Sequence, residues 1–249
     1  MMSPFIDALL GADRPVIMEL KARTASGEDL FGGRSPAELV AQYEAAGARC
    51  LSVVTGRWFG GTAELMREVA ALTHLPVLQK DFFTNAAQLG VARDLGASAV
   101  LLTASLLPQA ALTKLVDTGL SLGLTPFVEV VSAAEIAAVP RGDECVVAVN
   151  NKDIRDRERG AADIERSMHL LPAVLQSGSP CPVSASGIER ADVAARLLDA
   201  GYAGLLIATG LLRADGLDEW FAEVDRARGP RPQGPDPRSI EREVSACSA

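Results

Sequence analysis

Short apolar runs alternate with longer helical patterns eight times along this chain of 249 residues. Several runs are continuous stretches of Val, Leu and Ile, as is typical of strands buried on both faces of a sheet. We expect strands at about residues 15–20, 50–54, 76–79, 98–103, 124–130, 145–149, 181–184 and 204–208. Eight strand–helix repeats predict an α/β chain with one closed parallel sheet, a (β/α)₈ or TIM barrel spanning residues 1–228.

The stretches between these runs carry helix signals. We expect helices at about 36–47, 62–73, 86–95, 108–122, 132–139, 163–175, 190–200 and 216–227. Ser35 and Ser132 are each followed three positions later by glutamate, which predicts two capping boxes. An open, doubly wound sheet is the alternative fold. It is disfavoured because no GxGxxG motif follows the first strand.

Composition limits the partners. The net charge of -8 disfavours nucleic acid and anionic membranes as partners, and a small anionic substrate would require locally concentrated cations. No apolar run approaches 18 residues and the start lacks a signal-peptide pattern, so we expect no membrane span and a cytoplasmic location. The proline-rich residues 229–249 predict a disordered tail.

Four cysteines are present, at positions 50, 145, 181 and 247, and their spacing does not match a metal site. We interpret the first three as buried thiols at strand starts. No metal and no cofactor are expected.

Charged and polar residues stand where the predicted strands end. They are Glu19, Lys21, Lys80, Glu129, Asn150, Ser184 and Ser186. Burying charges in strands is unfavourable unless they converge on a polar site. In a (β/α)₈ barrel the carboxyl ends of all strands meet at one face, where active sites lie. The pattern therefore predicts an enzyme site at that face.

The motifs ELKARTAS, WFGGT, LPVLQKDF, VNNKDI and SGI, in this order and near successive strand ends, resemble those of indole-3-glycerol phosphate synthase. The resemblance runs from about Phe5 to about Phe221. It implies a carbon–carbon lyase of tryptophan biosynthesis. Such an enzyme closes the ring of 1-(2-carboxyphenylamino)-1-deoxyribulose 5-phosphate with loss of CO₂ and water.

The resemblance also implies catalytic roles. Lys80 is expected to be the general acid and Glu129 the partner acid or base. Lys21 is expected to hold the substrate carboxylate. Glu19 and Asn150 are expected to orient the anilino nitrogen and the hydroxyls. A buried ammonium aimed at the carbonyl oxygen can both stabilise and protonate it. The alternative is that these groups only form ion pairs at the barrel rim.

Barrels often bind phosphate with the loops after strands 7 and 8. For substrate and phosphate binding we expect Thr24, Ser26, Lys152, Ser184, Ser186, Gly187, Ala208, Thr209 and Gly210. The SGI motif is also compatible with an ordinary strand-to-helix turn.

The chain departs from the family pattern at several positions. Ala185 stands where the family has glutamate before SGI, Gly56 follows the second strand in place of an acidic residue, and Lys152 and the Ala208–Thr209 pair also differ. The segment before the first strand is short, so we expect the lid over the barrel mouth to be absent or supplied by another chain. A divergent paralogue acting on another phosphorylated aryl-amino sugar or ketose, or a catalytically silent ligand-binding barrel, are therefore alternatives. A monomer and a homodimer both remain open.

Overall fold

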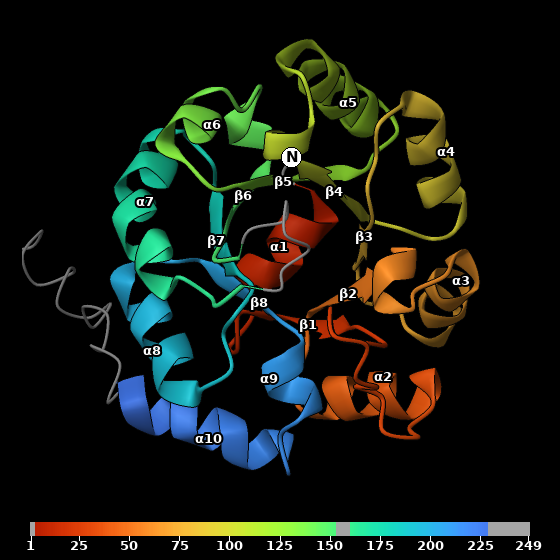
Figure 1. Cartoon of the computed structure of the whole chain (residues 1–249), viewed down its shortest axis with the longest axis vertical. Coiled ribbons are helices and arrows are strands. Elements are labelled where there is room, and N and C mark those ends of the chain that lie inside the picture. Colours follow the sequence, from red (N-terminus) through yellow and green to blue (C-terminus); the bar gives the residue numbers. More distant parts are fainter. Residues whose placement is uncertain (1–2, 153–159, 229–249) are drawn as a thin grey trace, which may run out of the picture.

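The computed structural model describes residues 3–152 and 160–228. Eight parallel strands form a closed ring in which each strand pairs with its neighbours in sequence and β8 pairs with β1 (Figure 1). The strands are β1 (Val16–Leu20), β2 (Cys50–Val54), β3 (Val77–Lys80), β4 (Ala99–Thr103), β5 (Thr125–Val130), β6 (Val146–Asn150), β7 (Cys181–Ala185) and β8 (Gly204–Ile207). The predicted barrel is confirmed. The predicted tail at 229–249 lies outside the described residues.

An outer layer of helices surrounds the strands (Figure 1). Its members are α2 (Pro36–Ala45), α3 (Ala63–Leu72), α4 (Ala86–Asp94), α5 (Gln109–Ser121), α6 (Ala133–Ala137), α7 (Ile164–Gln176), α8 (Ala191–Ala200) and α10 (Leu217–Arg228). The capping box at Ser35 forms in full. The box at Ser132 forms only in part, because the Glu135 carboxylate accepts instead from the backbone N–H of Val131 at 2.8 Å.

Several short elements were not predicted from the sequence. They are α1 (Pro4–Leu10), α9 (Thr209–Leu212) and the 3₁₀ turns η1 (Arg57–Phe59), η2 (Ala104–Leu106) and η3 (Gly142–Glu144). Each is shorter than the roughly 10 residues over which helical periodicity can be recognised.

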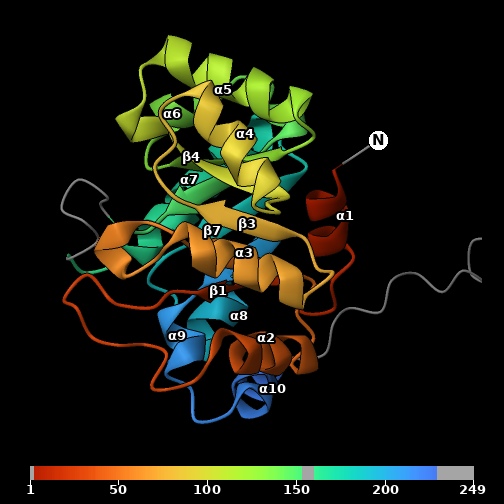
Figure 2. The same ribbon diagram turned by 90° about the vertical axis from the view of Figure 1, so that its right-hand side faces the viewer.

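Helix α1 closes the end of the barrel opposite α9, as the side view shows (Figure 2). Its buried residues Phe5, Ile6 and Leu9 belong to the apolar cluster inside the barrel. The Phe5 ring packs edge-on against Phe127 of β5, with 6.4 Å between centroids. Ser3 caps the helix and accepts a hydrogen bond from Thr125 at 2.7 Å. Helix α1 therefore fills the amino-terminal end of the barrel.

The described cysteines lie at or directly before strand starts and are buried free thiols, as predicted. Burial raises the pKa of Cys145 and Cys181 to about 12, and it also raises the pKa of Cys50. These thiols are therefore protonated at neutral pH, which suits packing rather than chemistry. Cys247 lies outside the described residues.

We expect Phe5→Ala to lower the free energy of unfolding by about 3–5 kcal/mol, because it leaves a cavity under the barrel. Urea denaturation followed by far-UV circular dichroism would measure this. Leu10→Ala is the matched control, since Leu10 lies in the same helix but is 41% exposed. Similar losses for the two variants would contradict the role of α1 as a plug.

Candidate active site

The register of the strands decides which side chains point into the barrel. Along β1, Ile17 lies in the interior cluster, and Glu19 two residues later shares that face. Glu19 pairs with Ser52 across β1 and β2, and Lys80 pairs with Val54 across β2 and β3. On the opposite side of the barrel, Glu129 lies two residues after Phe127, and Asn150 lies two residues after Ala148. Phe127 and Ala148 belong to the interior cluster, so both polar side chains share its face. The closed sheet therefore brings the predicted polar residues to one place.

Glu19 and Lys80 form a buried ion pair. The Lys80 Nζ lies 3.9 Å from Glu19 Oε1, and Ser52 donates a hydrogen bond to Glu19 Oε2 at 2.8 Å. The two side chains are only 2% and 10% exposed. Desolvating two charges is unfavourable, so the pair needs this added hydrogen bond to be tolerated. The arrangement holds an ammonium group at the floor of the pocket.

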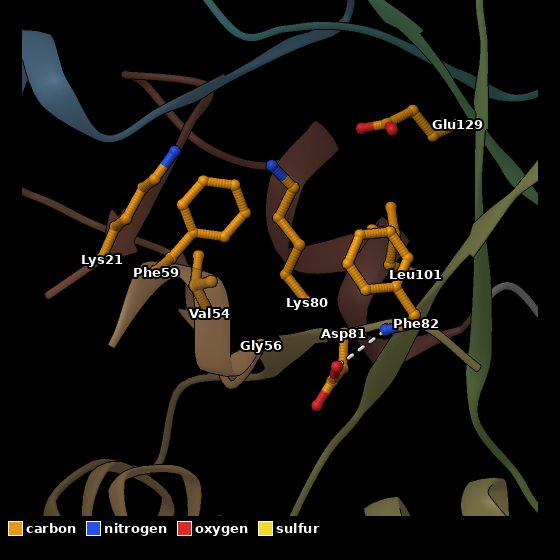
Figure 3. A pocket seen from close by; sticks show the side chains of 9 residues that line it. All are labelled: Lys21, Val54, Gly56, Phe59, Lys80, Asp81, Phe82, Leu101 and Glu129. Atoms are coloured by element: carbon orange, nitrogen blue, oxygen red, sulfur yellow. Dashed lines mark hydrogen bonds between the residues drawn. The ribbon is translucent and has the colours of Figure 1, made fainter. Parts of the chain in front are cut away.

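Lys21 extends from the end of β1 over an aromatic wall. Its Nζ lies 4.0 Å from the centroid of the Phe59 ring, a cation–π contact. The ends of Lys21, Lys80 and Glu129 point into the same part of the pocket (Figure 3). All three residues are 9% exposed or less. Two ammonium groups and a carboxylate thus share a site with little access to bulk water.

An apolar slot lies beside these charges. Its walls are Val54, Phe59, Phe82 and Leu101, with Gly56 at its edge (Figure 3). Trp58 packs edge-on against Phe82 with 5.1 Å between centroids, and at 57% exposed it extends the wall outward. These apolar and aromatic walls are the kind of surface against which an aryl ring packs.

A polar pocket adjoins the slot on the side of β7 and β8. Among its lining residues are Lys21, Lys80, Lys152, Ser186, Gly187, Ala208 and Thr209. Its three lysines outnumber the two carboxylates that also line it, of Glu19 and Glu189, so the pocket keeps the net positive charge that an anionic substrate requires. A neighbouring cavity of about 520 Å³ adds Thr24, Ser26 and Arg213. Most of the residues predicted to bind phosphate therefore lie around one connected space.

The loops after β7 and β8 are pressed together at Gly210. A Cβ on Gly210 would lie 2.7 Å from the Ile188 carbonyl oxygen, so glycine permits this approach. Ser186 adopts a left-handed backbone with φ +68°. For a residue other than glycine this conformation is uncommon, and it often marks a functional site. Gly210 shapes the pocket from behind and is buried, whereas Ser186 lines it.

Ser184 does not reach this pocket. Its hydroxyl lies 2.7 Å from the Ser167 hydroxyl of α7 and accepts a hydrogen bond from Asn151 at 3.1 Å. It therefore faces the outer helices, as expected from its position between the inward-facing Val183 and Ala185. The expectation that Ser184 binds substrate needs this correction. The sequence predicts that Ser184 lies at the end of a strand, but it does not predict that the side chain lies on the outer face of the barrel.

Asn150 is fully buried beside Ala185, its register partner in β7. Its Oδ1 accepts from the backbone N–H of Lys152 at 2.8 Å, and Arg166 donates to its carbonyl at 2.7 Å. Within the described residues, no hydrogen-bond partner is found for the Asn150 Nδ2. This buried amide is therefore a donor with no acceptor among the described residues, in the strand next to Ala185.

Sequence reasoning missed the residues that shape the pocket without carrying its chemistry. Phe59, Phe82, Leu101, Asp81 and Arg213 line it. The aromatic residues directly after β2 and β3 were a usable signal, because residues following strand ends reach this face.

The described residues contain no helix long and apolar enough to cross a membrane. In residues 3–152 and 160–228 there is also no cluster of three or more His, Cys, Asp or Glu side chains that could hold a metal ion.

Among solved structures, 3-hexulose-6-phosphate synthase from Salmonella typhimurium has a similar fold. Its TM-score is 0.65 at 12% identity, covering 86% of this chain and 97% of that one. This likeness supports the barrel alone.

Sequence comparisons are more specific. A relative from Carboxydothermus hydrogenoformans, named indole-3-glycerol phosphate synthase, is 35% identical over 80% of this chain and 74% of its own length. The protein of that name from Thermococcus kodakarensis is 33% identical over 84% of this chain and 91% of its own length. The family model described as indole-3-glycerol phosphate synthase matches residues 2–224. The chain therefore belongs to the indole-3-glycerol phosphate synthase family.

Proposed function

We propose that the protein is an indole-3-glycerol phosphate synthase, a carboxy-lyase that closes the indole ring of 1-(2-carboxyphenylamino)-1-deoxyribulose 5-phosphate. The observation that carries this proposal is the convergence of Lys21, Lys80 and Glu129 on an apolar, aromatic slot that adjoins a lysine-rich polar pocket. Membership of the family supports it. We place the enzyme in tryptophan biosynthesis in the cytoplasm.

The substrate fits the three parts of the site. Its aryl ring enters the slot formed by Phe59, Phe82 and Leu101. Its phosphate enters the polar pocket near Lys152 and Ser186. Lys21, which reaches both pockets, holds the aryl carboxylate. Binding at both ends places the C2′ carbonyl over the floor of the site, near Lys80.

Ring closure then proceeds by proton transfer. The aryl carbon bearing the carboxylate attacks the C2′ carbonyl carbon, and Lys80 donates a proton to the carbonyl oxygen, which becomes a hydroxyl. The bond to the carboxylate breaks, CO₂ leaves, and its electron pair restores the aromatic ring. Lys80 takes up a proton from solvent before it donates again, and the charge of Glu19, 3.9 Å away, stabilises the ammonium group that this restores.

Loss of water completes the reaction. Lys80 protonates the new hydroxyl, which leaves as water, while Glu129 removes a proton from the adjacent methylene carbon. These two events create the double bond of the indole. Acid and base enter from different strands, β3 and β5, so they can act on opposite ends of the bond that forms.

Gly56 and Ala185 favour a second candidate, a paralogue acting on another phosphorylated aryl-amino sugar or ketose. A Cβ at Gly56 would lie 3.8 Å from Asp81 and 4.0 Å from Phe59, both ordinary contact distances. The slot therefore has room for a side chain at this position, and glycine leaves that room open. Incubating the purified protein with the carboxyphenylamino sugar phosphate and following indole absorbance separates the two. Rapid indole formation supports the first proposal. Binding without product supports the second candidate or a barrel that binds ligand without catalysis.

We expect Lys80→Ala to lower turnover by about 10²–10⁴, the usual loss when a general acid is removed. Steady-state indole formation measures this, with circular dichroism to establish an intact fold. Lys114→Ala is the control, because Lys114 is exposed on α5. Near-normal turnover of Lys80→Ala would show that another group is the acid.

Ser186 and Ser184 are expected to respond differently to substitution. Ser186→Gly should raise KM by roughly tenfold, since a hydrogen bond to a charged group is lost, while glycine keeps the left-handed backbone. Ser184→Ala should leave KM unchanged and lower stability by about 1–3 kcal/mol, because its buried partners lose a hydrogen bond. Kinetics and urea denaturation of both variants give the comparison. A raised KM for Ser184→Ala, with an unchanged KM for Ser186→Gly, would show that Ser184 lies in the binding site.

We expect Ala185→Glu to raise the rate of indole formation. A carboxylate there can accept from the buried Asn150 amide and adds negative charge beside the lysines. Ala185→Gln is the control, because it has similar size without the charge. A gain with glutamate alone indicates a weakened member of the family. If neither variant gains and both are folded, the pocket serves a different substrate.

A further inference from the structure

The loop between β1 and α2 lies against α9, and two arginines hold it there. Arg34 donates to the carbonyls of Leu30, at 2.9 Å, and Leu212, at 2.7 Å, which joins the loop to α9. Arg213, at the end of α9, forms an ion pair with Glu28 in the same loop. The loop and α9 are therefore joined, and residues of both line one wall of the neighbouring cavity.

The residues from Thr24 to Glu28 form a closed turn. The Thr24 N–H donates to the Glu28 carbonyl at 3.0 Å, and the Glu28 N–H donates to the Thr24 hydroxyl at 3.1 Å. The Thr24 and Ser26 hydroxyls lie 2.8 Å apart. Because these bonds tie the two hydroxyls to the Glu28 backbone, whatever holds Glu28 also places the hydroxyls.

Arg213 stands between two acidic side chains at the edge of the cavity that adjoins the polar pocket, which we call the anion cavity. Besides pairing with Glu28, its Nη1 lies 3.8 Å from Glu189 in the loop after β7. The cavity of about 520 Å³ is lined by Arg213 and Glu189 but not by Glu28, and Lys21, Lys152 and Thr209 also line it. Two carboxylates thus offset the Arg213 charge, whereas Lys21 and Lys152 face the cavity.

We propose that Arg213 is a positioning residue for the phosphate of the substrate. By pairing with Glu28, it holds the Thr24 and Ser26 hydroxyls at the outer wall of the anion cavity. This inference rests on the proposed function in one respect, namely that the substrate carries a phosphate.

The exposure of the pair indicates where its effect should be measured. The Arg213 and Glu28 side chains are 47% and 48% exposed. Ion pairs of this kind contribute little to folding, and salt screens them. Arg34 bonds to carbonyls in the same wall and keeps the loop folded without Arg213. The loss of Arg213 should therefore appear in ligand binding rather than in stability.

The test uses Arg213→Ala, Glu28→Gln and the double variant, with Arg226→Ala as control. Arg226 forms a comparable exposed pair with Glu219 on α10, away from the cavity. Inorganic phosphate is titrated by calorimetry, and KM and kcat are measured on the sugar phosphate. Both single variants should raise the phosphate Kd and KM about two- to fivefold, with kcat unchanged. The double variant should be no weaker than either single variant, because the residues act as one unit.

Three results would overturn the proposal. If Glu28→Gln tightens phosphate binding while Arg213→Ala weakens it, then Arg213 contacts the phosphate itself. If neither variant differs from Arg226→Ala, the pair has no part in binding. If Arg213→Ala lowers Tm by several degrees more than Arg226→Ala, its role is merely structural. The phosphate titration needs no turnover, so absence of indole formation would refute the proposed function without deciding this question.

Discussion

Closure of the sheet is the constraint on which the rest of the molecule depends. Each strand pairs on both sides, so the direction of one side chain fixes the direction of its neighbours around the ring. Glu19 faces inward with its partner Ser52, and Lys80 faces inward with Val54. A shift of β1, β3 or β5 by one residue would turn its charged group into the apolar outer layer. The catalytic arrangement is thus a consequence of strand pairing.

The two ends of the barrel interior differ in the kind of side chain that they bury. At the amino-terminal end, Phe5 and Phe127 exclude water and fill the space with apolar side chains. At the carboxyl end, Glu19, Lys80 and Asn150 are almost as deeply buried but carry charge or strong dipoles. Such groups are stable there only with specific partners, for example the Ser52 hydroxyl beside Glu19. Stability and chemistry therefore occupy separate layers of one interior.

The sequence predicts the barrel well because its strands are uninterrupted apolar runs of similar length that alternate regularly with helices. It also predicts Lys21, Lys80 and Glu129 at the site, since charge in a buried strand requires an explanation. It does not predict which face a small polar residue takes. Ser184 and Ser186 differ by a left-handed backbone at Ser186 and by contacts with α7 that are distant in sequence. The sequence does not predict helix α1, because the helix is short and its contacts, on β2 and β5, are distant in sequence.

The placement of aromatic residues gives the molecule two separate optical reporters. The chain has two tryptophans. Trp58 is 57% exposed and packs against Phe82 at the rim of the slot, whereas Trp220, a buried residue of α10, is 7% exposed. Indole emission shifts with the polarity of its surroundings, so an occupied slot should alter the red-shifted component from Trp58. Unfolding should instead alter the blue-shifted component from Trp220. Ligand occupancy and the integrity of the fold can thus be followed in the same sample without any added label.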